Sequence, residues 1–374
     1  RAREYADPVI VHVITQKGRG YTPAENHVAD RFHAVGRIHP ETGLPVVPER
    51  FGWTAVFAEE IVSLARADER IVAITAAMQQ PVGLQPLADA MPERVIDVGI
   101  AEQHALTSAA GMAYAGLHPV VALYATFLNR AFDQVLMDVG LHGAGVTIVL
   151  DRAGLTGTDG ASHNGMWDMA LFCLVPGLRL AAPRDERTLR EALRTAVGVD
   201  DGPTIVRYPK GALPGPLPEV RTVGDDGDEG PFGAVDVLLE AAGEGPGGPL
   251  LLVGVGAMVP ATLEAGRALV ARGEAVTVAC PRWVVPVPRA LVDLAASARG
   301  VVVVEDGLVE GGVGSRLRDA LEDGAAGGGA RPVVARVGVP RRFVATASRP
   351  QLLADFGMDA AGIERTALGL GRRS

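Results

Sequence analysis

The chain has 374 residues, of which 48% are hydrophobic and 21% are charged, and its formal net charge is −9. This length predicts two or three domains, because a single hydrophobic core stops growing at about 250–300 residues. The composition is typical of layered α/β folds and excludes a disordered or fibrous protein. The negative charge argues against a general nucleic-acid or anionic-membrane surface, so any phosphate group must be held by locally placed basic residues.

The two cysteines, Cys173 and Cys280, lie far apart in apolar segments and form no Cys-x-x-Cys motif. We expect buried thiols rather than a disulfide or a metal site. No apolar run approaches ~20 residues and no signal peptide pattern opens the sequence. We therefore expect a soluble, cytoplasmic protein that binds neither membrane nor nucleic acid.

The first residue is Arg1, and the apolar run at 8–15 (PVIVHVIT) predicts a buried strand almost at once. We therefore expect residues 1–36 to be the tail of a domain that begins upstream. Residues 37–50 are polar and irregular, as in a linker.

From residue 51 onward, apolar runs alternate with helical patterns, which predicts a parallel sheet covered on both faces. The expected elements are a helix at 52–66, a helix near Leu84, and strands at 71–75, 95–98, 120–123 and 146–150. We place this doubly wound domain at 51–212. Residues 213–232, rich in proline and acidic residues, are expected to be a linker.

A second and smaller α/β domain is expected at 233–374. Its predicted strands lie at 250–255, 275–279, 301–304 and 333–337, and its predicted helices at 260–272, 289–296, 314–321 and after Arg349.

The run Asp97-Val98-Gly99-Ile100-Ala101-Glu102-Gln103-His104-Ala105 carries the strongest functional signal. Glu102 opens a helix directly after a strand, where ligands gather in open parallel sheets. A carboxylate that only balances the helix dipole is the alternative. The small apolar residues beyond Gln103 favour a buried carboxylate. A second helix start with Phe127 and Arg130 follows one βα unit later, a pairing that suits a thiamine diphosphate site.

The chain resembles the 1-deoxy-D-xylulose-5-phosphate synthases, which are thiamine diphosphate enzymes of the transketolase superfamily. The segments that carry this resemblance are 30–36 (DRFHAVG), 74–78 (ITAAM), 99–105 (GIAEQHA), 126–135 (TFLNRAFDQV), 151–154 (DRAG), 157–165 (GTDGASHNG) and 206–211 (VRYPKG). The resemblance implies the thiamine diphosphate-binding fold, with a pyrimidine domain and a transketolase C-terminal-like domain. It also implies a homodimer that condenses pyruvate with D-glyceraldehyde 3-phosphate after decarboxylation, using thiamine diphosphate and Mg²⁺.

Site residues follow from the same resemblance. Glu102 would contact the pyrimidine ring and promote its imino tautomer, and Phe127 would stack on that ring. His33 and His163 are the other expected catalytic residues. The expected cofactor contacts are Glu102, Phe127, Met78 and Ile100; the expected substrate contacts are Tyr124, Arg152, Asp159, His163 and Arg207.

Physical arguments support some of these residue types independently. Arginine forms bidentate pairs with phosphate, and loop histidines such as His163 serve function more often than core histidines. His104 is expected to be a structural histidine. Arg130 and Asp133 are expected to form an i,i+3 pair on a helix.

The sequence contains no Gly-Asp-Gly motif, which binds Mg²⁺ and the cofactor diphosphate in this superfamily. We therefore expect no metal ligands within the chain and no activity from the chain alone. Three hypotheses remain. The chain is a fragment of an ordinary synthase, or one subunit of a split enzyme that resembles transketolase or a 2-oxo acid dehydrogenase, or a non-catalytic binding or scaffold protein.

Overall fold

The computed structural model describes residues 2–27, 31–32, 35–46, 51–243, 248–323 and 331–370. The chain divides into two compact units, Arg1–Arg50 and Phe51–Ser374.

The first unit contains little regular structure. Its helices are η1 (Ala2–Glu4) and α1 (Thr22–Glu25). The strand predicted at 8–15 is wrong, because within the described part of this unit these residues pair with no strand, and Ile10 and Ile14 are 94% and 86% exposed. β-branched residues favour an extended backbone, but a strand also needs a neighbour that satisfies its N–H and C=O groups.

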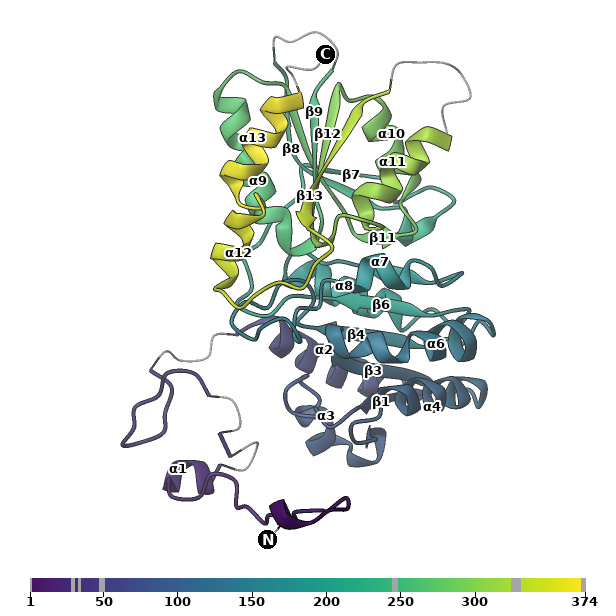
Figure 1. The fold of residues 1–374 in the computed structure, drawn as a ribbon. Coiled ribbons are helices and arrows are strands. Elements are labelled where there is room, and N and C mark those ends of the chain that lie inside the picture. Colours follow the sequence, from purple (N-terminus) through teal and green to yellow (C-terminus); the bar gives the residue numbers. More distant parts are fainter. Residues whose placement is uncertain are drawn as a thin grey trace. The chain divides into compact units, whose positions relative to one another are not determined.

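The second unit contains two sheets (Figure 1), and one hydrophobic cluster includes buried residues of both. The first sheet has the strand order β11-β5-β6-β4-β3-β1-β2 and is parallel except for β11. Its strands are β1 (Ile71–Thr75), β2 (Val95–Asp97), β3 (His118–Tyr124), β4 (Thr147–Asp151), β5 (Arg179–Ala181), β6 (Thr204–Arg207) and β11 (Trp283–Val285). The predicted parallel sheet is thus confirmed, and β1 has the predicted bounds.

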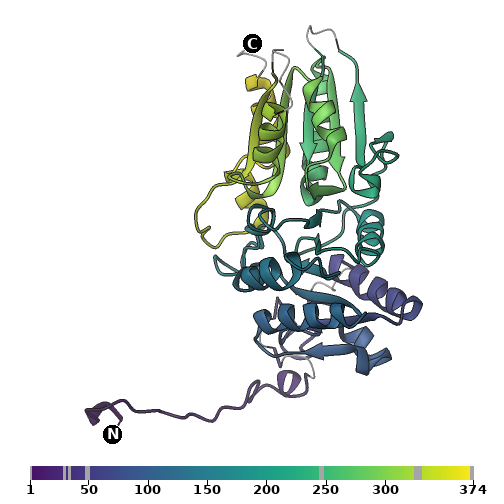
Figure 2. The same ribbon diagram turned by 90° about the vertical axis from the view of Figure 1, so that its right-hand side faces the viewer.

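Helices cover both faces of this sheet (Figure 2). On one face lie α2 (Trp53–Ala67), α3 (Gln85–Ala90) and α8 (Glu186–Ala196), where α2 packs against α3 and α8. On the other lie α4 (Glu102–Tyr114), α6 (Phe132–Gln134), the π-helical turn η4 (Val135–Gly140) and α7 (Asp168–Phe172). Three short connections complete this half: η2 (Pro92–Arg94), α5 (Ala125–Leu128) and η3 (Asn129–Ala131). Central strands β3 and β4 are buried throughout, as expected for strands covered on both sides.

The second sheet has the order β13-β12-β9-β10-β8-β7, with parallel pairs from β13 to β10 and antiparallel pairs from there to β7. Its strands are β7 (Arg221–Val223), β8 (Val235–Ala241), β9 (Leu250–Gly254), β10 (Val276–Pro281), β12 (Gly300–Leu308) and β13 (Val333–Val339). α9 (Val259–Ala271), α12 (Arg349–Asp355) and α13 (Ala360–Leu370) cover one face, and α10 (Arg289–Ala296) and α11 (Val313–Asp323) the other (Figure 1). The turns η5 (Gly230–Phe232) and η6 (Gly256–Met258) precede β8 and α9.

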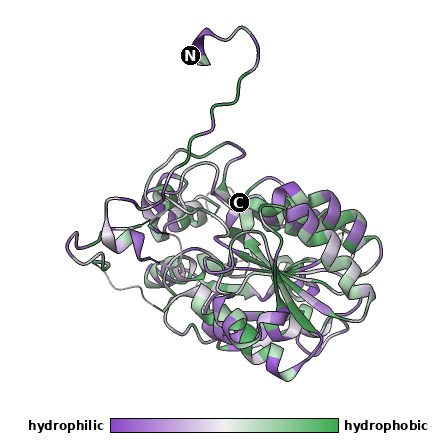
Figure 3. Cartoon of the chain, turned by 90° about the horizontal axis from the view of Figure 1, so that it is seen from below, coloured by the Kyte–Doolittle hydropathy of each residue, from purple (hydrophilic) through white to green (hydrophobic). Residues whose placement is uncertain are grey.

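The positions of two strands differ from the predicted division into domains. β11 lies in the second half of the chain but pairs antiparallel with β5 of the first sheet. β7 lies within the expected linker 213–232 and pairs with β8. Hydropathy follows the layers, with apolar strands between helices that turn polar faces outward (Figure 3). Among the described helices, none combines the length and the apolarity that a membrane span requires.

Candidate functional site

The carboxyl ends of five neighbouring parallel strands meet at one edge of the first sheet, in the order β6, β4, β3, β1 and β2. Parallel strands bring the residues that follow them to the same edge, where ligands bind in open α/β sheets. His33 lies outside the described residues. Every other predicted site residue ends or follows one of these strands: Met78, Ile100, Glu102, Tyr124, Phe127, Arg152, Asp159, His163 and Arg207.

Glu102 is the first residue of α4 and is 2% exposed. The turn before it is fixed by Asp97, whose Oδ1 accepts hydrogen bonds from the backbone N–H of Ala77 at 2.7 Å and of Gly99 at 2.9 Å. Gly99 has φ 72°, a conformation that glycine adopts without strain. These contacts tie β1 to β2 and direct the chain into α4. The burial expected from the sequence is confirmed, and the carboxylate lies at the positive end of the helix dipole.

Arg130 approaches this carboxylate. Its Nη1 lies 3.5 Å from Oε2 of Glu102, and the Arg130 side chain is 49% exposed. The sequence had paired Arg130 with Asp133 on one helix. In the structure Arg130 lies in the 3₁₀ turn η3 and Asp133 in α6, which follows it directly, and Arg130 pairs with Glu102 instead.

A row of stacked side chains lies beside the strand ends. The guanidinium of Arg152 sits 4.2 Å above the ring of Tyr124. Tyr124 stacks on Phe127 with centroids 5.9 Å apart, and Phe127 meets the edge of His163 at 5.7 Å. Nδ1 of His163 lies 2.9 Å from Oγ of Ser162. Four residues that the sequence assigned to the site are therefore in sequential contact.

The loop 152–165, which carries Arg152 and His163 of this row as well as Asp159, is held closed. Gly154 and Gly165 exchange backbone hydrogen bonds of 3.0 and 2.8 Å. Oδ1 of Asn164 accepts from the backbone N–H and the hydroxyl of Thr156 at 2.9 and 3.1 Å. The loop thus has a defined shape, which fixes where its functional side chains begin.

Asp159 in this loop bridges two cations. Its Oδ2 accepts from Arg152 Nη1 at 2.9 Å, and Lys210 Nζ lies 2.6 and 2.9 Å from its two oxygens. Lys210 belongs to one of the segments that carry the family resemblance, but no role was predicted for it.

A buried carboxyl group, that of Asp151, lies at the end of β4 directly before Arg152. Asp151 accepts a hydrogen bond of 2.6 Å from the hydroxyl of Thr54. Burial raises the pKa of Asp151 to about 6, while the Thr54 bond and the neighbouring Arg152 oppose the rise. Burial also raises the pKa of Tyr124.

Arg207 is placed differently from the other expected phosphate contacts. It is 3% exposed, and its Nε and Nη1 donate to Asp168 at 2.5 Å and to Asp306 at 2.8 Å. Its Nη2 is buried without a hydrogen-bond partner among the described residues. The side chain ties β6 to α7 and to β12 of the second sheet.

The remaining expected residues differ in exposure. Met78 is 9% exposed after β1, whereas Ile100 is 78% exposed before α4. His104, expected to be structural, lies exposed on α4.

The described residues fit one half of thiamine diphosphate. A buried carboxylate with one long ion pair can bond a ring nitrogen, and aromatic rings lie along the same sheet edge. The other half needs a hard cation held by clustered oxygen ligands. No group of three or more His, Cys, Asp or Glu residues suited to a metal occurs in the described part of the chain.

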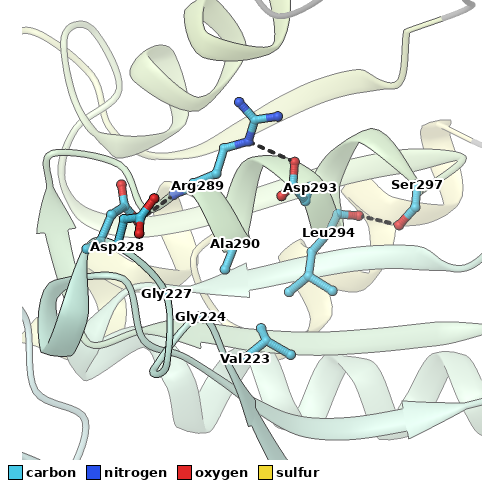
Figure 4. Close-up of a pocket in the computed structure, with 10 residues that line it drawn as sticks. Val223, Gly224, Gly227, Asp228, Arg289, Ala290, Asp293, Leu294 and Ser297 are labelled. Carbon is cyan, nitrogen blue, oxygen red and sulfur yellow. Dashed lines mark hydrogen bonds and ion pairs between the residues drawn. The ribbon is translucent and has the colours of Figure 1, made fainter.

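A hollow of about 630 Å³ lies elsewhere in the second unit, between the loop after β7 and α10 (Figure 4). Arg289 spans its rim, with Nε 3.0 Å from Asp293 and its backbone N–H 3.0 Å from a Glu229 oxygen. None of the described residues predicted for the site lines it.

Comparisons with known families agree with this architecture. Residues 49–216 match the transketolase pyrimidine binding domain, and residues 240–363 match the transketolase C-terminal domain. The chain belongs to the transketolase superfamily. The family expected from the sequence motifs is thereby confirmed, as is the fold class.

Three bacterial relatives show where in the superfamily the chain lies. It is 55% identical to 1-deoxy-D-xylulose-5-phosphate synthase 2 of Streptomyces avermitilis over 99% of this chain and 55% of that protein. It is 54% identical to the synthase of Clavibacter sepedonicus, over 98% of this chain and 54% of that one. It is 50% identical to the synthase of Corynebacterium glutamicum, over 98% and 56%. The chain thus spans about half the length of the curated relatives it matches.

Solved structures show the same fold. A split gene transketolase, described as an inactive β4 tetramer, matches with a TM-score of 0.69 at 26% identity, over 84% of this chain and 96% of that chain. Transketolase from Leishmania mexicana matches with a TM-score of 0.67 at 20% identity, over 85% and 45%.

Proposed function

We propose that this chain supplies the pyrimidine side of the active site in a 1-deoxy-D-xylulose-5-phosphate synthase-type transferase. The reaction would decarboxylate pyruvate and condense the product with D-glyceraldehyde 3-phosphate. The observation that carries the proposal is the buried Glu102 carboxylate at the start of α4, on the same sheet edge as the row from Arg152 to His163. Relatives with this name at 50–55% identity support the choice of reaction.

Glu102 would hold the proton that the pyrimidine ring exchanges. Thiamine diphosphate, when bound, supplies the electron sink that decarboxylation of a 2-oxo acid needs. A carboxylate in a nearly dry position can form a strong charge-assisted bond to a ring N–H. Arg130 would keep this carboxylate oriented, and Phe127 and Met78 would contact the ring, with Ile100 covering it.

The acceptor would bind along the row of stacked side chains. Arg152 offers a planar cation to phosphate, and Tyr124 beneath it fixes the guanidinium plane. Nδ1 of His163 lies against the Ser162 hydroxyl, so we assign the substrate contact to Nε2. Asp159 would contact an acceptor hydroxyl, and Arg207 would add a second cation. His33 remains a proposal based on the resemblance.

The proposed enzyme also needs a part that binds Mg²⁺ and the cofactor diphosphate. The sequence has no Gly-Asp-Gly motif, so we propose that a diphosphate-binding domain supplies Mg²⁺ and the diphosphate contacts. That domain could be joined to these residues or be a separate chain. The likeness to a split gene transketolase over 96% of its length supports the second arrangement. We also propose a homodimer, which light scattering would test.

The proposal is tested by deuterium exchange at thiazolium C2 in the complete enzyme. Glu102→Gln should lower the exchange rate by about 10² to 10⁴-fold, the range for a positioned acid-base group. Glu60→Gln is the matched control, since Glu60 is also 2% exposed but lies on α2, paired with Arg190 and Arg194. An exchange rate in Glu102→Gln equal to that of Glu60→Gln would remove Glu102 from the mechanism.

A second test concerns the need for the other domain. We expect the 374-residue chain alone to release no carbon dioxide from pyruvate with thiamine diphosphate and Mg²⁺. Addition of the diphosphate-binding domain of a bacterial synthase should restore release. Release by the chain alone, after mass spectrometry excludes contaminating enzyme, would disprove the requirement. Failure of both carbon dioxide release and C2 exchange after this addition would favour the non-catalytic alternative.

A further inference from the structure

The loop 152–165, which carries Asp159 and His163, is anchored in the half of the chain that holds the second sheet. Leu155 of this loop is 0% exposed and belongs to a hydrophobic cluster formed mainly by the second sheet and by α9, α12 and α13. Directly after the loop, the carbonyl of Met166 accepts a hydrogen bond of 3.1 Å from the N–H of Leu308 on β12. A loop that serves the proposed site on the first sheet is therefore built into the core of the second.

The loop backbone also lies directly against residues of the second half. A Cβ at Gly154 would overlap Oδ2 of Asp306 on β12, and a Cβ at Gly157 would lie 2.9 Å from the backbone nitrogen of Arg349. Both glycines have positive φ, 75° and 84°. The close approach is possible because these positions carry no side chain, and Asp306 and Arg349 form part of the surface on which the loop lies.

The guanidinium of Arg349 contacts both the loop and this carboxylate. Its Nε donates to the carbonyl of Leu155 at 3.0 Å, and its Nη2 lies 3.6 Å from Oδ2 of the buried Asp306. Arg349 is also the first residue of α12, where the helix dipole disfavours a cation. The contacts to the loop and to Asp306 offset this unfavourable placement, which points to a role outside the helix.

We propose that Arg349 is a positioning residue for the acceptor step, through which the second half of the chain holds the loop in the shape that presents His163. This inference rests on the proposed function. The bonded carbonyl of Leu155 lies eight residues before His163, and two glycines of positive φ lie between them. A stretch of this kind has many alternative conformations once it is released. Fixing it before the acceptor binds removes an ordering cost from the reaction.

Glu102 lies outside this loop, which allows positioning to be separated from general stability. It begins α4 after the turn that Asp97 fixes. A loss of global stability would lower every step of the reaction alike, whereas release of the loop would affect the step that uses the acceptor. In the complete enzyme Arg349→Gln should therefore lower kcat/KM for D-glyceraldehyde 3-phosphate by about 10- to 100-fold and leave C2 exchange within about twofold of the wild type.

Arg94→Gln is the matched control. Arg94 also donates from its guanidinium to a backbone carbonyl, that of Ala65 at 2.6 Å, but this bond joins η2 to α2 beside the first sheet. This variant should leave both measurements near the wild-type values. Arg349→Lys keeps a flexible cation near the Leu155 carbonyl, so it should recover part of the lost acceptor rate.

Hydrogen exchange of the 374-residue chain tests the same contact without cofactor or turnover. The N–H groups of Gly154, Thr156 and Gly165 are hydrogen-bonded within the loop, so their exchange measures its opening. Arg349→Gln should speed the exchange of peptides from 152–165 about tenfold or more, because one hydrogen bond and one ion pair that hold the loop are lost. Peptides from β3 and β4 should exchange as in the wild type.

Two results would overturn the inference. One is equal exchange of the loop in Arg349→Gln and Arg94→Gln. The other is a uniform effect of Arg349→Gln, with faster exchange throughout the chain or with C2 exchange lowered as much as acceptor turnover, which would assign Arg349 to global stability. A wild-type complete enzyme without synthase activity would refute the proposed function instead, and the hydrogen exchange of the loop is measured independently of that result.

Discussion

Arg130 Nη1 lies 3.5 Å from Oε2 of Glu102, so a half-exposed cation from the segment after β3 reaches the buried carboxylate that begins α4. The contact joins two segments of the site that no helix periodicity relates. It gives the Glu102 side chain one fixed partner within a nearly dry environment.

We expect Arg130→Ala to loosen the Glu102 carboxylate without abolishing its chemistry. An ion pair with one exposed partner contributes at most ~1 kcal/mol, so C2 exchange at saturating cofactor should fall by no more than about fivefold. Arg130→Lys should recover part of the rate. Arg66, exposed on α2, provides the control variant Arg66→Ala. Equal exchange rates in the two alanine variants would show that Arg130 has no effect on the chemistry of Glu102.

Arg207 is predicted to matter first for stability. Arg207→Ala leaves Asp168 and Asp306 buried with one charge partner fewer, and breaking a buried pair typically costs about 3–5 kcal/mol. Urea denaturation of the variant should show this loss. In the background Asp168→Asn/Asp306→Asn the same change should cost much less. An unchanged unfolding midpoint would contradict this structural role. If Arg207 instead contacts the acceptor's phosphate, the variant should raise the KM for D-glyceraldehyde 3-phosphate more than the KM for pyruvate.

The sequence predicted the elements that carry long apolar runs. The strand predicted at 71–75 and the helix predicted at 289–296 have the same bounds as β1 and α10 in the structure. The three-residue strands β5 and β11 were missed, because a strand this short carries little periodicity, whereas β2, which is equally short, was predicted at 95–98. Their pairing also depends on residues about one hundred positions apart, which only the tertiary fold brings together.

The site was predicted in the same way, by local motif. Glu102 and Phe127 stood out because their segments resemble a known family and flank strand ends. Lys210 did not, because its partner Asp159 lies 51 positions away and meets it only through the adjacency of β4 and β6. The pairing of Arg130 with Asp133 was wrong for a related reason, since Arg130 approaches Glu102, 28 positions away in the sequence.

Gly165 is expected to be irreplaceable in the loop that carries His163. A Cβ at this position would lie 2.6 Å from both the Ala125 Cβ and the Arg152 carbonyl oxygen. Gly165→Ala should therefore displace the loop and destabilise the protein by about 1–3 kcal/mol. Gly369→Ala, on α13 with nothing within 4 Å, is the control and should be neutral or slightly stabilising. Thermal unfolding of both variants decides; equal midpoints would contradict the steric argument.

The last prediction concerns the pH dependence of stability through Glu305, a buried residue of β12. Its two carboxyl oxygens accept from the backbone N–H of Val313 at 2.8 Å and of Gly314 at 3.0 Å. Burial outweighs these bonds and raises the pKa of Glu305 from 4.5 to about 7. The folded state thus holds a proton that the unfolded state has released in this pH range.

The sign of the effect follows from this proton. The stabilising contribution is complete below pH 4.5 and is lost as the pH rises through 7, a change of roughly 3 kcal/mol. Glu305→Gln carries no titrating proton, so its free energy of unfolding relative to the wild type should rise by that amount between pH 4.5 and pH 8. Urea denaturation at half-unit pH steps measures the difference. A constant difference across the range would show that Glu305 titrates alike in the folded and unfolded states, which would contradict the raised pKa.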